Sequence, residues 1–363
     1  MGRIYLFDPA VYYFLMTEQQ KRRRARMFFT WFTILAMVGL AYILREQIAE
    51  TIQNLARVNA WVLLLLIPLH VASYYSQGKL YQGIFRALGE RFRTKSMYRL
   101  TLELNFINNV FPSGGVSGFS YLPIRLKNEG ITTGQATLVQ LMRFMTIFSG
   151  FQVLLFVGVF MLSLHGDVNN LTILAASSLT TLLLVGTGLL AYIIGHRGRI
   201  TAFFTFVTKA VNLLIHIVRP KHPETINISK AQNAFMELHD NYMKIRRNLH
   251  QLKRPFLFGL CFSLAELASI YVVYIAFGEL VNPGAIILAY AIANFAGIIS
   301  VLPGGIGIYE ALMTGVLIAA GVPASVSLPV TIMYRVLNMA IALPQGGWLY
   351  YRALHGKPAK IHV

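Results

Sequence analysis

The clearest pattern in this 363-residue chain is a series of long apolar segments separated by polar, mostly basic ones. A helix needs roughly 20 mostly apolar residues to cross the hydrocarbon core of a bilayer. Six segments approach or exceed this length, and we expect each to cross the membrane as a helix: 28–44, 60–77, 131–164, 171–195, 255–280 and 326–351. The pattern therefore predicts an all-α polytopic membrane protein with about six full spans.

Two further apolar segments, 100–126 and 285–320, are interrupted near their middle by a proline and adjacent glycines. Proline and glycine break helices, and broken backbone at membrane depth is tolerated only where protein or a water-filled cavity covers it. We therefore expect both segments to form re-entrant or broken helical hairpins. The arms of the second segment are longer, so two full spans joined by a tight loop are the alternative there.

The two interrupted segments carry similar landmarks in the same order. The first has Asn105-Phe106, Pro112, Gly130 and Arg143, and the second has Asn294-Phe295, Pro303, Gly321 and Arg335. The proline and the later glycine are 18 residues apart in both copies, and the arginine follows that glycine by 13 and 14 residues. With six spans, the two hairpins enter from opposite sides, which predicts an inverted repeat. Inverted repeats with broken helices are typical of secondary transporters.

Composition supports the membrane assignment and changes how the charge is interpreted. The chain is 56% apolar and 13% charged, against about 45–50% and about 25% in soluble domains. A net charge of +18 would suggest nucleic acid in a soluble protein. Here the six-span arrangement puts all but four of the 32 basic residues on one side, which is the positive-inside pattern. We therefore expect no nucleic-acid partner, and a cytoplasmic (inner) membrane protein with both termini in the cytoplasm.

This arrangement divides the chain into two membrane halves with cytoplasmic segments around them. The expected parts are a basic cytoplasmic tail over 1–27, a first membrane half over 28–195, a cytoplasmic loop over 196–254, a second membrane half over 255–351 and a cytoplasmic tail over 352–363. The loop is expected to contain an interfacial helix followed by a polar helix.

Five charged residues are candidates for a position near the bilayer centre: Glu103, Arg143, Glu266, Glu310 and Arg335. An ionised group at the bilayer centre costs about 2.5–3.5 kcal/mol on insertion scales, so it needs a partner or a wet cavity. Two interpretations stay open: the arginines pair with the glutamates and lock helices together, or an arginine binds a lipid phosphate through its planar fork. Helix starts after the glycines offer further anion sites. The remaining candidate substrate-binding residues are Asn105, Pro112, Gly114, Gly115, Ser117, Arg125, Pro303, Gly304, Gly305, Gly307 and Asn338.

Catalytic motifs are weak in this sequence. Residues 115–118 match the GxSG of rhomboid intramembrane proteases, but their chemistry needs a histidine near the serine, and the segment 255–352 contains none. We find no P-loop, no HExxH motif and no Cys/His cluster, so we expect no metal or other cofactor. The alternatives are a membrane-embedded enzyme acting on lipids or lipid-linked sugars, with Ser117 or Glu310 as its reactive group, and a scaffold that binds a soluble partner through the loop.

The segment Leu302-Pro-Gly-Gly-Ile-Gly-Ile-Tyr-Glu310 resembles the transmembrane, flippase-like region of lysylphosphatidylglycerol synthases, and in particular stand-alone members that lack the synthetase domain. Their P-G-G-x-G-x-x-E signature is matched by Pro303, Gly304, Gly305, Gly307 and Glu310. An approximate first-half counterpart is formed by Pro112, Gly114, Gly115, Gly118 and Arg125, without the acidic residue usual there. The resemblance covers roughly residues 28–351.

This resemblance implies movement of a charged lipid between leaflets. Because only a short tail follows Arg352, it does not imply synthesis of lysylphosphatidylglycerol by this chain. We therefore expect a lipid transporter or flippase, not an enzyme, in which a headgroup enters a polar groove between the two repeats. The expected partners are membrane lipids, in particular anionic phospholipid.

Overall fold

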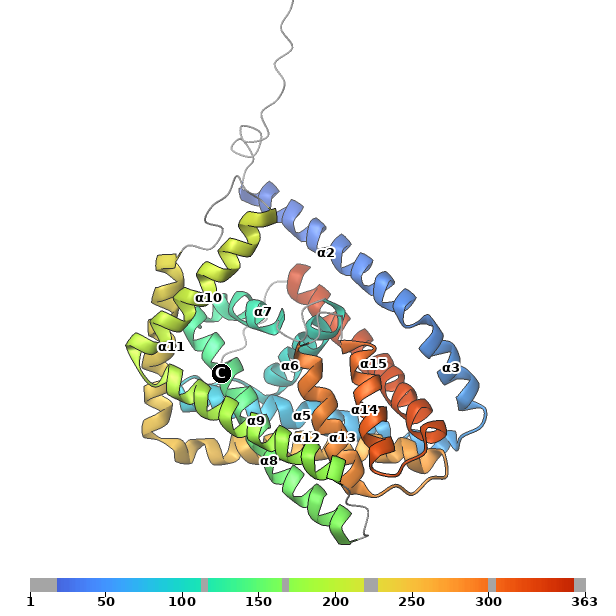
Figure 1. The fold of residues 1–363 in the computed structure, drawn as a ribbon. Helices are drawn as coiled ribbons and strands as arrows, with labels where there is room; N and C mark the ends of the chain where they lie inside the picture. Colours follow the sequence, from blue (N-terminus) through green and yellow to red (C-terminus); the bar gives the residue numbers. More distant parts are fainter. Residues whose placement is uncertain (1–17, 112–116, 165–169, 219–227, 300–304, 356–363) are drawn as a thin grey trace, which may run out of the picture.

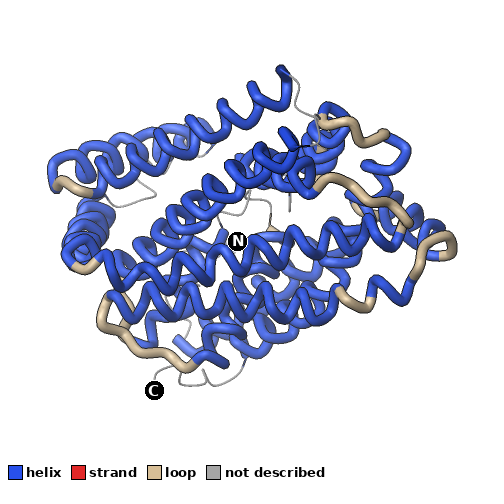
Figure 2. The backbone as a smooth tube through the Cα atoms, turned by 90° about the horizontal axis from the view of Figure 1, so that it is seen from below, coloured by secondary structure: helices blue, strands red, loops and turns tan. Residues whose placement is uncertain are grey.

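The computed structural model describes residues 18–111, 117–164, 170–218, 228–299 and 305–355. Within these ranges every regular element is a helix, as Figure 2 shows. The α-helices are α2 (Glu18–Ile43), α3 (Arg45–Leu55), α4 (Ala60–Leu63), α5 (Leu66–Ala87), α6 (Thr94–Val110), α7 (Ser117–Leu126), α8 (Thr133–Leu164), α9 (Asn170–Ile194), α10 (Arg197–Val218), α11 (Ile228–Arg247), α12 (Lys253–Ala276), α13 (Pro283–Ile299), α14 (Ile308–Ala319) and α15 (Ala324–His355). The predicted all-α class is confirmed.

The long helices agree with the predicted spans. Five stretches of the described chain are long and apolar enough to cross a membrane, namely Ala60–Ala87, Thr133–Leu164, Ile173–Ile194, Leu249–Ala276 and Ala324–His355. The end of α2 and α3 together make a sixth candidate, bent by 57° at Leu44. Large apolar side chains on these helices face outward, and Trp31, Trp61 and Phe156 are 70%, 82% and 68% exposed. Such exposure is favourable in lipid rather than in water.

The four hairpin helices are shorter than the spans. Helices α6 and α13 have 17 residues each, whereas α7 has 10 and α14 has 12. At about 1.5 Å of rise per residue they measure roughly 15–26 Å, less than the core thickness of about 30 Å. Helix α13 packs along α14, and α6 contacts α7 (Figure 1). Entry of the hairpins from opposite sides of the membrane stays a prediction.

The two halves are joined by reciprocal packing. Helix α5 packs along α12, while α6 of the first half packs on α15 and α13 of the second half packs on α8 (Figure 1). Glycines allow close approach at both crossings. A Cβ added to Gly346 of α15 would lie 2.5 Å from the carbonyl oxygen of Leu102, and one on Gly158 of α8 would lie 3.0 Å from Ile287 Cγ2. Each half therefore supplies the packing surface for the other half's hairpin.

Helices α5 and α12 end in the same turn. Gly89 and Gly278 follow them with φ values of 94° and 79°, a left-handed conformation that glycine adopts without steric cost. The next N–H then bonds back to the helix: Glu90 N donates to the Phe85 carbonyl oxygen, and Glu279 N to that of Tyr274, each at 3.0 Å. This is the Schellman arrangement in both halves.

A second turn before the long helices also matches. After Gly130, the N–H of Ile131 donates to the carbonyl oxygen of Leu126 at 3.4 Å, and after Gly321 the N–H of Val322 donates to that of Leu317 at 2.9 Å. The helices that follow, α8 and α15, both have 32 residues. The two halves therefore share these turns and the length of the helix that follows, while the inverted repeat itself stays a prediction.

The segment between the halves forms two helices, α10 and α11, which pack on each other, while α11 also packs on α8. Arg197 of α10 donates to Asp240 of α11 at 2.8 Å in an exposed ion pair. The loop predicted between the halves is thus attached to the first membrane half.

Candidate functional site

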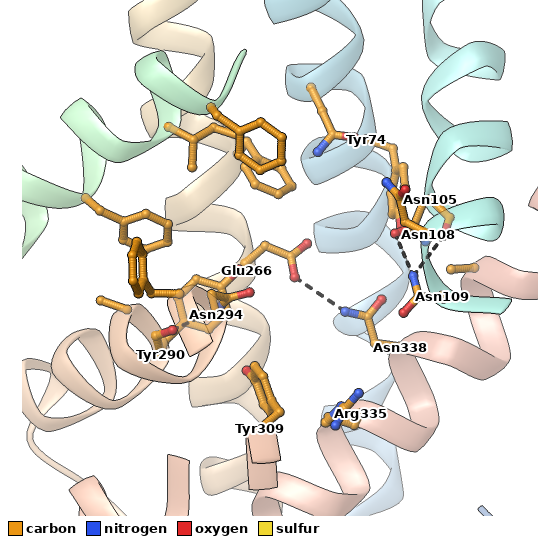
Figure 3. A pocket seen from close by; sticks show the side chains of 18 of the residues that line it. Tyr74, Asn105, Asn108, Asn109, Glu266, Tyr290, Asn294, Tyr309, Arg335 and Asn338 are labelled. Atoms are coloured by element: carbon orange, nitrogen blue, oxygen red, sulfur yellow. Dashed lines mark hydrogen bonds between the residues drawn. The ribbon is translucent and has the colours of Figure 1, made fainter. Parts of the chain in front are cut away.

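A cavity of about 290 Å³ lies where the two halves meet, and we refer to it as the central cavity. Residues of α5, α6, α8, α9, α12, α13, α14 and α15 line it (Figure 3). Its polar lining side chains are Tyr74, Gln77, Asn105, Asn108, Asn109, Arg143, Glu266, Tyr290, Asn294, Tyr309, Tyr334, Arg335 and Asn338. A polar cavity among helices this apolar indicates a site for a polar ligand.

Arg143 of α8 reaches this cavity without a counter-charge. No carboxylate of the described chain forms an ion pair with it, and its buried Nε has no hydrogen-bond partner. Its guanidinium carbon lies 5.2 Å from the ring centre of Phe144 and 5.9 Å from that of Tyr81. Aromatic rings attract a cation but leave its hydrogen-bond donors available. Arg143 is therefore prepared to bind an anion that enters the cavity.

Arg335 of α15 is instead neutralised within the protein. Its Nη1 donates to Glu310 Oε1 of α14 at 2.5 Å, and both side chains are less than a tenth exposed. The other carboxylate oxygen of Glu310 accepts from the N–H of Gly307 at 2.7 Å, at the start of α14. Gln47 of α3 also donates to Glu310, at 3.4 Å. The anion at the start of α14 is thus the protein's own Glu310. Of the two interpretations given above, Arg335 fits the one in which an arginine pairs with a glutamate and holds two helices together.

A second ion pair closes the first hairpin. Arg125 Nε of α7 donates to Glu103 Oε2 of α6 at 2.9 Å, and the Tyr121 hydroxyl donates to the same oxygen at 2.8 Å. Neither Glu103 nor Arg125 lines the central cavity. This pair therefore holds α6 to α7 and lies apart from the candidate ligand site.

Glu266 of α12 is the acidic counterpart of Arg143 in the cavity. It accepts hydrogen bonds from the hydroxyls of Ser73 and Tyr334 at 2.5 and 2.7 Å. It also accepts one from Asn338 Nδ2 at 3.4 Å, which Figure 3 shows as a dashed line. No basic side chain among the described residues forms an ion pair with it. Its negative charge is thus held by neutral donors from α5 and α15 only.

Asparagines from both hairpins complete the polar lining. Asn109 Nδ2 donates to the carbonyl oxygen and to Oδ1 of Asn105, at 2.9 and 3.0 Å, and Asn294 Nδ2 donates to the carbonyl oxygen of Tyr290 at 2.8 Å. Asn105 and Asn294 are the asparagines at the matching positions of the predicted repeat, and both line the central cavity. Each hairpin therefore contributes amide groups that can donate to or accept from a ligand.

The structure separates the predicted site residues into three groups. Those that line the central cavity are Arg143, Arg335, Glu266, Asn105 and Asn338. Those that do not line it are Glu103, Glu310, Ser117, Arg125, Gly305 and Gly307. Those that lie outside the described residues are Pro112, Gly114, Gly115, Pro303 and Gly304.

Sequence reasoning did not select the tyrosines of this cavity, nor Gln77. Tyr74, Tyr290, Tyr309 and Tyr334 lie within apolar segments, where a tyrosine cannot be told from one facing lipid. Tyr334 directly precedes Arg335, and this neighbouring arginine was the one signal that could have pointed to it.

The cavity lies within a region of the chain that matches a known protein family. A family model described as the lysylphosphatidylglycerol synthase TM region matches residues 29–346. The chain belongs to this family. The resemblance inferred from residues 302–310 is thereby confirmed, and the matched region contains every residue that lines the central cavity.

Two curated archaeal relatives are also similar to parts of this family member. A UPF0104 membrane protein of Methanothermobacter thermautotrophicus is 32% identical over 97 residues, which cover 27% of this chain and 29% of that protein. A UPF0104 membrane protein of Pyrococcus horikoshii is 23% identical over 150 residues, which cover 40% of this chain and 45% of that protein. The matches therefore span less than half of either relative, and their names describe membrane proteins without stating an activity.

Proposed function

We propose that this protein moves a phosphate-bearing lipid headgroup between the leaflets of the cytoplasmic membrane through the central cavity. The single observation that carries the proposal is Arg143, a half-buried arginine without a carboxylate partner in the described chain, in a polar cavity between two membrane halves. Holding such a charge in the membrane costs about 2.5–3.5 kcal/mol on insertion scales, and a bound phosphate offsets that cost. The arginine fork matches phosphate oxygens in a bidentate geometry.

The arrangement of the halves supports transport rather than storage of the headgroup. The matched turns after α5 and α12, the matched long helices and the reciprocal packing of α6 on α15 and α13 on α8 all support an inverted repeat. Transporters with inverted repeats bind their substrate at the repeat interface and expose it alternately to the two sides. The central cavity occupies that interface.

The size of the cavity supports a headgroup as the bound part. A volume of about 290 Å³ is just below the range of about 300–1,000 Å³ for ligand pockets. It accommodates a small polar headgroup, whereas the acyl chains remain in lipid. In this proposal both termini lie in the cytoplasm, as the distribution of basic residues indicates.

A reconstituted flipping assay tests the proposal. The full chain is placed in vesicles that contain phospholipid labelled on one acyl chain, and the rate at which label reaches the other leaflet is measured. We expect Arg143→Gln to lower this rate at least about tenfold, because a lost charge-assisted contact is worth roughly 1.5–3 kcal/mol. Arg197→Gln, which removes an exposed arginine outside the cavity, is the matched control and retains the wild-type rate.

The same vesicles separate transport from lipid chemistry. If Arg143→Gln flips lipid at the wild-type rate, the proposed function is wrong. Mass spectrometry of the lipids after the assay detects any covalent change, which an enzyme acting on lipids produces and a transporter does not. Unchanged lipid masses together with a lost rate in Arg143→Gln are the result expected here.

A further inference from the structure

The positive and negative charges in and next to the central cavity sum to zero within the described chain. One arginine is paired directly with a glutamate, whereas the other arginine and a second glutamate are not paired. Three charged side chains line it: Arg143, Glu266 and Arg335. Arg335 is neutralised directly by Glu310 at 2.5 Å. Arg143 and Glu266 form no ion pair, neither with each other nor with another described residue, so the cavity contains one separated positive and one separated negative charge.

This arrangement restricts which headgroup can enter at low cost. A headgroup with only a phosphate pairs with Arg143 but leaves the buried Glu266 uncompensated and gives the filled cavity a net negative charge. An unpaired charge in a low-dielectric site costs several kcal/mol. A headgroup with one phosphate and one ammonium compensates both groups and leaves the filled cavity neutral.

The surroundings of Glu266 suit an ammonium group. Tyr74, Tyr290, Tyr309 and Tyr334 line the same cavity, and tyrosine faces attract ammonium cations, more strongly when the site is desolvated. The carboxylate already accepts from Ser73, Tyr334 and Asn338, which fix its position but supply no positive charge. A carboxylate accommodates roughly four hydrogen bonds, so an ammonium donor can still be added.

We propose that the transported lipid has a zwitterionic headgroup, an inference that rests on the proposed function. Arg143 binds its phosphate and Glu266 binds its ammonium group, as in a phosphoethanolamine-type headgroup. A zwitterionic lipid differs from the anionic phospholipid expected from the sequence. Removal of the Glu266 charge should slow transport of a zwitterionic lipid but speed transport of an anionic one.

The structure also supplies a matched substitution for Glu266. The repeat places Ala87-Leu-Gly-Glu90 opposite Ala276-Phe-Gly-Glu279, and the same offset places Gln77 of α5 opposite Glu266 of α12. Both side chains line the central cavity. Glu266→Gln therefore installs the amide that the first half already carries, and Gln77→Glu installs a second carboxylate.

The test compares two chain-labelled lipids, phosphatidylethanolamine and phosphatidylglycerol, in otherwise identical vesicles. We expect wild-type protein to flip phosphatidylethanolamine at least about tenfold faster, since a desolvated charge pair contributes enough binding energy for that factor. Glu266→Gln lowers the phosphatidylethanolamine rate about tenfold and raises the phosphatidylglycerol rate, which reverses the preference. Gln77→Glu slows phosphatidylglycerol further. Arg143→Gln slows both lipids, because both have a phosphate.

The outcomes distinguish this inference from the proposed function. If Arg143→Gln slows both lipids but Glu266→Gln changes both rates by the same factor or neither rate, the zwitterionic headgroup is wrong and the phosphate site stands. If Arg143→Gln slows neither lipid, the proposed function itself fails. Size-exclusion profiles and unfolding midpoints show whether each variant is folded. If Glu266→Gln does not fold, Gln77→Glu decides instead. An unchanged ratio of the phosphatidylethanolamine rate to the phosphatidylglycerol rate in Gln77→Glu overturns the inference.

Discussion

The two membrane halves, α5–α8 and α12–α15, share their backbone turns but place their charges differently. In the first half the buried ion pair, Glu103 with Arg125, joins the two helices of the hairpin. In the second half the pair, Glu310 with Arg335, joins the hairpin helix α14 to the long helix α15. The long helix of the first half therefore keeps an arginine, Arg143, that no hairpin glutamate neutralises. The two halves therefore share turns and helix lengths, whereas only one of the two arginines is paired with a described carboxylate.

Two sequence differences accompany this divergence: a one-residue difference in register, and Phe119 in α7 at the place where α14 has Glu310. Arg143 lies 13 residues after Gly130, whereas Arg335 lies 14 residues after Gly321. Because α8 and α15 are both unbroken helices of 32 residues, one residue corresponds to a rotation of about 100° about the helix axis. The position equivalent to Arg143 is Tyr334. Both arginines line the central cavity, but only Arg335 forms an ion pair with a described glutamate of its hairpin.

The largest expected effect tests whether the second-half ion pair stabilises the fold. Glu310→Gln leaves Arg335 buried without its carboxylate, and removing one partner of a buried pair costs about 3–5 kcal/mol. Unfolding in mixed detergent with increasing dodecyl sulfate measures this loss of free energy. The double variant Glu310→Gln/Arg335→Gln is expected to recover part of the stability. A single variant as stable as wild type would contradict a structural role for the second-half pair.

The next effect tests the packing by which each half holds the other. At Gly346 an added methyl group meets the Leu102 carbonyl oxygen, which cannot move without shifting α6, so Gly346→Ala is expected to cost about 1–3 kcal/mol. At Gly158 the nearest atoms, Ile287 Cγ2 and Cβ, lie farther away, at 3.0 and 3.1 Å, so a smaller shift makes room for the methyl group. The same unfolding measurement should therefore show a smaller loss for Gly158→Ala, and the reverse order would indicate that α8 and α13 form the tighter crossing.

The smallest expected effect compares the contributions of Arg143 and Arg335 to the free energy of unfolding. Arg143→Gln removes a charge that has no carboxylate partner in the described chain, so we expect the free energy of unfolding to fall by no more than about 0.5 kcal/mol. Arg335→Gln, which strands Glu310, serves as the destabilising reference. A cost above about 2 kcal/mol for Arg143→Gln would show that Arg143 also holds helices together.

The fold was largely predictable because span length and helix breakers are local properties of the chain. Apolar length located the spans, and Pro112 and Pro303 located the interruptions. The sequence contains a further sign of the repeat in Ala-x-Gly-Glu, which precedes the hairpin in both halves and forms the turns at Gly89 and Gly278.

The site was less predictable because it depends on helix rotation and on contacts between distant segments. The sequence supplied the five intramembrane charges, but it did not indicate which would pair: Arg335 selects Glu310, Arg125 selects Glu103, and Glu266 remains with neutral donors. A change of about 100° in side-chain direction follows from a single residue of register, which a comparison of approximate spacings does not resolve.

The reciprocal packing of the halves has a consequence for how the chain is made. Helix α6 carries Glu103 and three asparagines, too polar a segment to remain in lipid alone, and its packing surface in the other half is α15. That surface is synthesised only from residue 324 onward, long after α6 ends at residue 110. Until α15 is made, α6 has α5 and α7 of its own half to pack against. The packing of α6 is therefore completed only after α15 has been synthesised.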